Sequence, residues 1–309
     1  MTDVAICVAT RKRPQGLTRT LRSLAALDTA RDVAVVVADN DGEGREGIAA
    51  AEMLRAEGYR WPLHLLTVAE PGIPQARNAL VAAALALPGV RFVAMLDDDE
   101  AAEPGWVEAM LACQAATGAD VVGGAVLREL EGEVAPWAKA HPLLQPKSRG
   151  TSGPVPLVDS TANVLIAADA LRSIGERPFN EQMALTGGSD KQLFTRMQRA
   201  GARFAWAEDA RVTELIPASR ITSKWLLMRG YRIGMTDMLI DIFHSSRFKA
   251  AAAEAPRIAG GVVIGGIGAA LTLDRGKRIV RLGQVYRAAG KIAALTGHRY
   301  EEYSKVHGA

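Results

Sequence analysis

The first 126 residues alternate short apolar runs with segments of helical spacing, and this order constrains the fold more than any other feature. The apolar runs have the length of buried strands and cover residues 4–9, 33–38, 63–68 and 92–96. Segments with the spacing of amphipathic helices separate them, at residues 17–27, 47–57 and 74–87. This order predicts an α/β fold, with a mostly parallel central sheet and helices on both faces.

The pattern continues less regularly after residue 100. Helices are predicted at residues 106–116 and 190–199, and strands at residues 120–126, 163–166 and 203–206. Five prolines between residues 130 and 160 predict a long loop, which we expect to cover the site.

The last 93 residues differ from the rest in charge. Residues 217–309 carry 15 Lys+Arg against 6 Asp+Glu, whereas residues 1–216 carry 22 against 28. A basic and apolar tail fits an anionic membrane surface, and it contains no nucleic-acid-binding motif, so no nucleic acid partner is expected. Residues 221–243 predict a long helix. Residues 258–273 have no charge but are shorter than the roughly 20 residues that cross a bilayer, which leaves a buried helix pair or a helix lying on the membrane.

The strongest chemical signal is the run Asp97-Asp98-Asp99-Glu100, which directly follows the apolar run at 92–96. Four adjacent carboxylates repel one another unless a cation neutralises them. Carboxylate oxygens suit Mg²⁺ or Mn²⁺, and Mg²⁺-type ions commonly bind phosphates as well. The run therefore predicts a metal-dependent site for a diphosphate substrate. A solvated acidic turn is the alternative.

Further polar residues follow other predicted strands. Asp39 closes the strand at 33–38, and ligands of parallel sheets bind beyond the carboxyl ends of the strands, so we expect it near the acidic run. Arg77 lies near the start of the helix at 74–87, where an anion can bind. Arg11 and Arg13 follow the first strand and could face phosphates. An ordinary turn and solvated arginines are the alternative interpretations.

Several classes of site are excluded by absent motifs. The chain has no GxGxxG after the first strand, no GxxxxGK[ST] and no GxSxG. These absences argue against a nicotinamide cofactor, a P-loop and a nucleophile elbow. Cys7 and Cys113 lie in apolar segments and are expected to be reduced core thiols, and no secretory signal is visible, so a cytoplasmic location is predicted. Ser189 or Asp190 could cap the helix at 190–199, and the alternative interpretation is that Asp190 is a general base.

Together these motifs resemble the family-2 glycosyltransferases, which have a GT-A fold, over roughly residues 3–220. The segments that carry the resemblance are Val8-Ala9-Thr10-Arg11-Lys12-Arg13-Pro14, Val37-Ala38-Asp39-Asn40-Asp41, Ala76-Arg77-Asn78-Ala79, Leu96-Asp97-Asp98-Asp99-Glu100 and Gly188-Ser189-Asp190. The resemblance implies inverting transfer of one hexose from a nucleotide-sugar, usually UDP-linked, with Mn²⁺ or Mg²⁺ as cofactor. The residues expected to bind the nucleotide-sugar are Thr10, Arg11, Arg13, Asp39, Arg77, Asp97 and Asp98.

Individual roles follow from the same resemblance. Asp39 would contact the base, Asp97 the ribose or the metal, and Arg77 the nucleotide. Asp99, which closes the DXD motif, would hold the metal. Asp190 would be the catalytic base that deprotonates the acceptor hydroxyl.

The chain also departs from the family pattern. Many members have a histidine metal ligand after a later strand, where this chain has Glu214. Glutamate can bind Mg²⁺ or Mn²⁺, so Glu214 is a candidate third ligand. Many members have Glu-Asp where this chain has Ser189-Asp190. The Gln-x-x-Arg-Trp motif of processive synthases is missing.

The tail resembles bacterial exopolysaccharide-assembly members of the family, through Pro217-x-x-Arg220 and the ending Gly297-x-x-Tyr300-x-x-Tyr303. Such members add one sugar to a lipid-linked oligosaccharide, which implies a lipid-linked or glycan acceptor and a peripheral location at the inner face of the plasma membrane. We therefore expect a GT-A catalytic domain at residues 1–216 and a C-terminal helical extension at residues 217–309. The nucleotide-sugar half of the domain would span about residues 1–126 and the acceptor half about 127–216. A non-catalytic sugar-binding or assembly subunit and a sugar nucleotidyltransferase are the alternatives.

Overall fold

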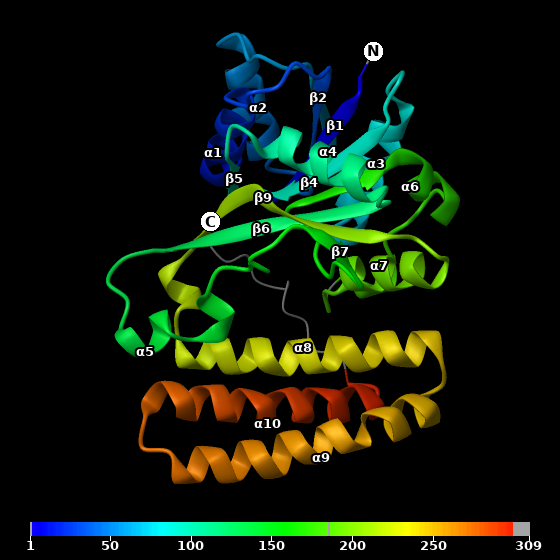
Figure 1. The fold of residues 1–309 in the computed structure, drawn as a ribbon. Coiled ribbons are helices and arrows are strands. Elements are labelled where there is room, and N and C mark those ends of the chain that lie inside the picture. The colour runs from blue at the N-terminus through cyan, green and yellow to red at the C-terminus, as the bar shows by residue number, and fades with distance from the viewer. Residues whose placement is uncertain (1, 185, 299–309) are drawn as a thin grey trace.

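The computed structural model describes residues 2–184 and 186–298, and it places a central sheet between helices, above three long C-terminal helices (Figure 1). The strands are β1 (Val4–Thr10), β2 (Val33–Asp39), β3 (Leu63–Thr67), β4 (Phe92–Asp97), β5 (Glu100–Ala102), β6 (Val121–Leu130), β7 (Gly153–Val155), β8 (Val164–Ala167) and β9 (Phe204–Ile216). The α-helices are α1 (Pro14–Ala25), α2 (Glu46–Ala56), α3 (Ile73–Ala86), α4 (Trp106–Thr117), α5 (Pro136–Lys139), α6 (Ala168–Ile174), α7 (Ser189–Arg199), α8 (Ser223–His244), α9 (Arg247–Leu271) and α10 (Arg275–Leu295). Three short 3₁₀ turns are η1 (Pro142–Leu144), η2 (Glu181–Met183) and η3 (Ala218–Arg220).

The strands pair in the order β3-β2-β1-β4-β8-β6-β9-β5, and β7 pairs with β9. The first four are parallel, because α1, α2 and α3 supply the crossover that parallel neighbours need. β8 is antiparallel to both β4 and β6, and β5 and β7 are antiparallel to β9. The predicted α/β class with a central sheet is confirmed, while the half of the sheet beyond β4 is mixed.

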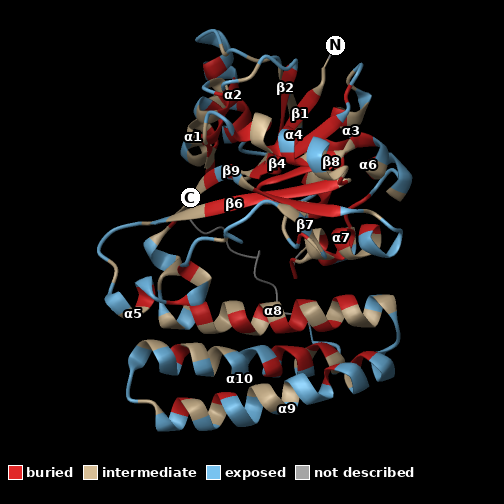
Figure 2. Cartoon of the chain, in the orientation of Figure 1, coloured by how far each residue is buried: buried red, intermediate tan, exposed pale blue. Residues whose placement is uncertain are grey.

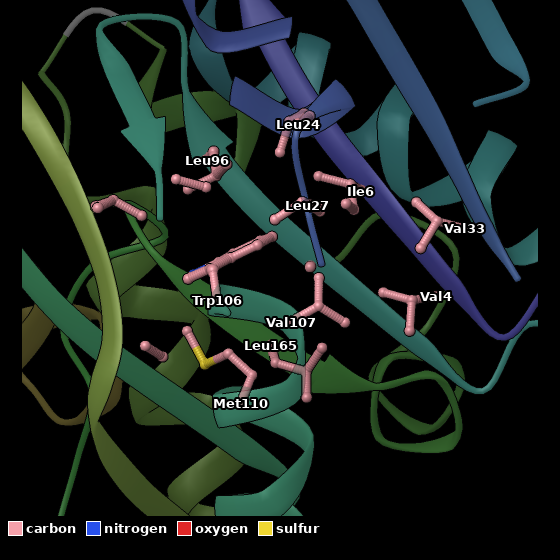
Figure 3. Packing of buried hydrophobic residues seen from close by; sticks show 14 of the residues in the cluster. Val4, Ile6, Leu24, Leu27, Val33, Leu96, Trp106, Val107, Met110 and Leu165 are labelled. Atoms are coloured by element: carbon pink, nitrogen blue, oxygen red, sulfur yellow. The ribbon is translucent and has the colours of Figure 1, made fainter. Parts of the chain in front are cut away.

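The core fills both faces of this sheet. On one face, Leu17, Leu21 and Leu24 of α1 recur at helical spacing and pack, with Trp106 of α4, against the strands (Figure 3). On the other face, Leu80 of α3 and Phe194 of α7 belong to a second buried cluster. Buried residues accordingly concentrate in the strands (Figure 2). This packing holds the strand ends, and the site built on them, in fixed positions.

The register of the parallel strands brings the predicted site residues to one edge. Thr10 of β1 pairs with Asp39 of β2, and Ala9 of β1 pairs with Asp97 of β4. Thr10, Asp39 and Asp97 therefore lie at neighbouring carboxyl ends, as the strand–helix order predicts.

The segment predicted as a long loop at residues 130–160 contains α5, η1 and β7. Ala138 of α5 and Leu144 of η1 pack in one apolar cluster with Ile216, with Leu226 of α8 and with Ile279 of α10. The start of this segment is thus tied to the C-terminal helices, while β7 at its end pairs with β9.

The C-terminal helices follow directly on the last strand, since β9 ends at Ile216 and α8 begins at Ser223. The predicted helix at 221–243 corresponds to α8, and the uncharged stretch 258–273 lies largely in α9, which runs through Pro256. α8 faces the sheet, α10 lies against α8, and α9 lies beyond α10 (Figure 1). Among the described residues, no helix combines the length and the apolar character needed to cross a membrane. The division into a catalytic domain and an extension stays a prediction.

Candidate functional site

The four acids after β4 point in alternate directions. The side chains of Asp97 and Asp99 are 42% and 21% exposed, whereas those of Asp98 and Glu100 are buried. The acidic run is therefore not a uniform patch: two carboxylates face outward and two are built into the fold.

The buried pair fixes the turn. Asp98 accepts hydrogen bonds from Thr10 Oγ1 at 2.8 Å and from Arg13 Nη1 at 3.0 Å. Burial raises the pKa of Asp98 to about 6, while the charge of Arg13 opposes this shift. Glu100 folds back to accept the backbone N–H of Asp97 at 2.9 Å, and burial, with the charge of Asp97, raises its pKa well above the ordinary range. These contacts hold β4, β5 and the loop after β1 together.

The outward carboxylates are each paired with arginine. Asp97 Oδ1 lies 3.1 Å from Arg77 Nη2 of α3. Asp99 Oδ2 lies 3.2 Å from Arg13 Nη1 and 3.5 Å from Arg220 Nη1. The result is a network of arginines and carboxylates along the sheet edge.

Glu214 joins the same edge from β9. The β5–β9 register places it opposite Glu100, and its Oε2 lies 3.2 Å from Arg128 Nε of β6. Burial and the charge of Asp99 raise the pKa of Glu214, while Arg128 opposes the shift. The backbone N–H of Leu215 donates to the Asp99 carbonyl at 3.1 Å, so β9 brings Glu214 to the acidic run.

Three arginines of this network have no assigned role in the sequence-based prediction. Arg19 of α1 donates to the Asp99 carbonyl, Arg128 pairs with Glu214, and Arg220 pairs with Asp99. Arg220 lies in the Pro217-x-x-Arg220 motif, which is a signal at sequence level. Arg19 and Arg128 carry no such signal, because their partners are 80 and 86 residues away.

Asp39 lies at the end of β2 and is fully buried. Its Oδ1 accepts the N–H of Asp41 at 3.0 Å, and its Oδ2 accepts those of Gly47 and Ile48 at 2.9 and 3.2 Å. It therefore satisfies free N–H groups at the start of α2. A Cβ on Gly47 would lie 2.9 Å from Asp39 Oδ2, which explains the glycine there. The sequence did not predict this structural role, and a contact of Asp39 with a base stays a prediction.

Arg11 lies after β1 and is half-buried. Its Nε is buried and has no hydrogen-bond partner among residues 2–184 and 186–298. A buried guanidinium nitrogen without a partner is uncommon, and it suits a site that receives an anion.

Asp190 lies in the first turn of α7 and is half-buried. The predicted capping role is wrong: Gly188 occupies the N-cap, with no side-chain hydrogen bond. Among residues 2–184 and 186–298, Asp190 Oδ1 accepts the N–H of Lys191 alone, at 2.9 Å. Gly188 has a φ of +90°, and a Cβ there would lie 2.0 Å from Thr236 Cγ2 of α8. Close packing against α8 thus positions the turn that carries Asp190.

The structure brings most of the predicted residues into one network. Thr10, Arg13, Arg77 and the acidic run are joined by hydrogen bonds and ion pairs, and β9 adds Glu214 beside Asp99. Within the described part of the chain, no hydrogen bond or ion pair joins Asp190 to that network. Its helix is tied instead to α8, where Asp237 Oδ1 lies 2.6 Å from Lys191 Nζ.

The fit to a divalent cation is partial. In the described ranges, no group of three or more His, Cys, Asp or Glu side chains is arranged to hold a metal ion. The outward carboxylates Asp97 and Asp99 nevertheless have the chemistry that Mg²⁺ and Mn²⁺ prefer. Mg²⁺-type ions are commonly held by one or two carboxylates together with substrate phosphates. Asp97 and Asp99 fit this mode of binding, in which phosphates of the substrate complete the coordination of the metal ion.

This fold and this site define a glycosyltransferase of GT-A type. Comparisons with known proteins agree with this class. Residues 5–175 match the family model described as glycosyl transferase family 2. The succinoglycan biosynthesis protein ExoM of Rhizobium meliloti strain 1021 is 35% identical over 242 residues, which cover 76% of this chain and 73% of that protein. The chain belongs to glycosyl transferase family 2.

Solved structures show the same fold. The mannosyltransferase PcManGT from Pyrobaculum calidifontis, in complex with GDP-Man and Mn²⁺, matches with a TM-score of 0.64 and 17% identity, covering 96% of this chain and 88% of that one. TarS 1–349 of S. aureus, in complex with UDP, matches with a TM-score of 0.52 and 16% identity, covering 97% and 93%. These likenesses confirm the predicted GT-A fold.

Proposed function

We propose that this glycosyltransferase moves one hexose, with inversion, from a UDP-sugar to a hydroxyl of a lipid-linked oligosaccharide in exopolysaccharide assembly. The observation that carries the proposal is the edge where Asp97 and Asp99 face outward among arginines. The likeness to a succinoglycan biosynthesis protein supports the pathway class, and a neighbour that binds UDP supports the donor class. The protein would act peripherally at the cytoplasmic face of the plasma membrane.

The donor's diphosphate would meet Arg11, Arg13 and Arg77. Arg11 has the buried, unpartnered Nε, and the other two lie within 3.2 Å of the outward carboxylates. On donor binding, Arg77 would turn from Asp97 and Arg13 from Asp99 to the phosphate oxygens, since guanidinium groups bind both. Asp97 and Asp99 would hold Mn²⁺ or Mg²⁺, with Glu214 as a candidate further ligand. The metal would offset charge on the departing diphosphate.

Asp190 would act as the general base. Its carboxylate would take the proton of the acceptor hydroxyl as the hydroxyl oxygen attacks the anomeric carbon of the donor sugar. Thr10 and Asp98 would hold Arg13 in place. Asp39 would fix the end of the neighbouring strand and would also contact the nucleobase of the donor.

The first test is hydrolysis of a panel of nucleotide-sugars by the purified protein, with Mn²⁺, with Mg²⁺ and with EDTA. We expect slow release of UDP from one sugar, abolished by EDTA. The Asp190→Asn protein should still bind this donor, but transfer to a lipid-linked acceptor should fall about 10²–10⁴-fold, the usual contribution of a general base.

Two outcomes would contradict the proposal. If no nucleotide-sugar is hydrolysed or bound in the presence of metal, the assignment of Asp97 and Asp99 to the donor site fails. If Asp190→Asn restores exopolysaccharide synthesis in cells that lack the gene, the protein is a non-catalytic assembly subunit.

A further inference from the structure

The outer face of α9 is apolar and uncovered. We define it as Val263, Ile264, Ile267 and Leu271, which lie within about 100° of one another around an α-helix. Their exposed fractions are 55%, 62%, 56% and 79%. Four adjacent large apolar side chains left in water are costly, so this face is expected to have a partner.

The opposite face of α9 consists of small residues and packs on α10. A Cβ on Gly261 would lie 3.1 Å from Ala288 Cβ, one on Gly265 would lie 2.9 Å from the Arg281 carbonyl oxygen, and one on Gly268 would lie 3.0 Å from Arg281 Cδ. The helix thus turns Gly261, Gly265 and Gly268 toward α10 and its bulky apolar residues outward. A water-facing helix has the reverse arrangement, whereas helices in lipid pack through small residues and present bulky ones to the acyl chains.

The exposed charges around this face are mainly positive; the exception is Asp274, which follows α9 and caps the start of α10. Residues 255–273 contain no acidic residue, and Glu254, just before them, is buried and paired with Lys291 and Arg257. Exposed cations lie at both ends of α9: Lys249 in its first turn and Lys277 just after its end, within Arg275-Gly276-Lys277-Arg278. An apolar face between cationic ends is complementary to the surface of a bilayer that contains anionic phospholipid.

We propose that the outer face of α9 docks on an anionic phospholipid bilayer, with the helix lying in the interface and Lys249 and Lys277 on the lipid headgroups. α9 is the helix farthest from the sheet, so a membrane can approach it without meeting the catalytic edge (Figure 2). This inference deepens the proposed function, because it names the surface that brings the enzyme to a lipid-linked acceptor. Its evidence, however, is independent of the donor site.

The test is co-sedimentation of the full chain with vesicles of phosphatidylcholine, with and without phosphatidylglycerol. We expect binding to the vesicles with phosphatidylglycerol, weakened by added salt and by Lys249→Glu with Lys277→Glu. Ile264→Glu should weaken binding about tenfold or more, since it puts a charge in place of an apolar side chain that the bilayer would bury. Met53→Glu is the matched control, because Met53 is 66% exposed on α2, away from α9, and it should bind like the unaltered chain.

Three outcomes would overturn this inference. The unaltered chain could fail to bind the vesicles, or Ile264→Glu could bind them as well as Met53→Glu does. Alternatively, sedimentation equilibrium could show a dimer that Ile264→Glu dissociates, with no vesicle binding, and a second copy would then be the partner.

Ile264→Glu should still hydrolyse the nucleotide-sugar, and this activity shows that the variant folds. If the unaltered chain hydrolyses no donor, the proposed function fails, while vesicle binding still decides this inference.

Discussion

Adjacent acids in the run Asp97–Glu100 have different functions at the scale of single residues. Asp98 and Glu100 are buried and accept hydrogen bonds that hold three segments together, whereas Asp97 and Asp99 face the arginines of the site. Substitutions one position apart should therefore separate stability from activity.

Asp98→Ala should lower the free energy of unfolding by about 1–3 kcal/mol, because it leaves Thr10 Oγ1 and part of Arg13 without an acceptor. Asp97→Ala should cost about 1 kcal/mol or less, since Asp97 is 42% exposed, yet it should abolish donor hydrolysis. Urea unfolding and the hydrolysis assay measure the two effects. Equal losses of stability in the two variants would contradict the inward placement of Asp98.

The sequence predicts where these residues meet better than what each one contacts. Asp39 and Asp97 end the two parallel strands that flank β1, so their shared edge follows from the strand–helix order. Which acid of the run points inward depends on the backbone of the turn, and the pairing of Asp99 with Arg220 depends on a segment 121 residues away. Neither is visible in local spacing.

At the scale of helices and strands, too, the sequence does not reveal features that depend on distant segments. The long strands β1, β2 and β4 are continuous apolar runs that stand out in the sequence, whereas β5 and β7 are three residues each and exist because β9 offers them an edge. The turn before α7 has a similar dependence on its surroundings: Gly188 is required by Thr236, which lies in a different helix.

Gly188→Ala should destabilise the protein by about 2–5 kcal/mol, through the left-handed backbone conformation and the clash with Thr236 Cγ2. Gly201→Ala is the matched control: Gly201 has a φ of +93° but nothing within 4 Å of its Cβ position, so only about 1–2 kcal/mol is expected. Thermal unfolding of the two variants measures the difference.

Adding Thr236→Ser to Gly188→Ala removes the clashing methyl group and should recover most of that difference. Because the turn carries Asp190, transfer activity should fall in Gly188→Ala and return with the second substitution. If Gly188→Ala and Gly201→Ala lose the same stability, the packing of this turn on α8 is not the cause.

At the scale of the whole molecule, the C-terminal helices are connected to the site by several contacts. Arg220 pairs with Asp99, and Asp237 of α8 pairs with Lys191 of α7 and with Arg287 of α10, in both cases at 2.6 Å. Leu226 of α8 is buried in the cluster that includes Ile216. All of these contacts except the Asp237–Arg287 pair cross the predicted boundary between residues 216 and 217.

A chain that ends at Ile216 should therefore fail to form a stable, active domain. Its apolar cluster around Ile216 would be exposed, and the turn before Asp190 would lose its support from α8. We expect weak near-ultraviolet circular dichroism, rapid proteolysis and loss of donor hydrolysis. A fragment that unfolds cooperatively and hydrolyses the donor would show that residues 1–216 are an independent unit.

The stacking of α8, α10 and α9 also sets the distance between the sheet and the outer face of α9. Packed helices lie roughly 8–10 Å apart. The first half of α9 contacts α8, but α10 separates α8 from the C-terminal half of α9, which therefore lies on the order of 16–20 Å from α8. If α9 rests on the bilayer, the helices act as a spacer that keeps the catalytic edge well above the lipid headgroups. The spacer would then select acceptors by length. A glycan with only its first sugar would not reach the candidate site, whereas a longer glycan on the same lipid would.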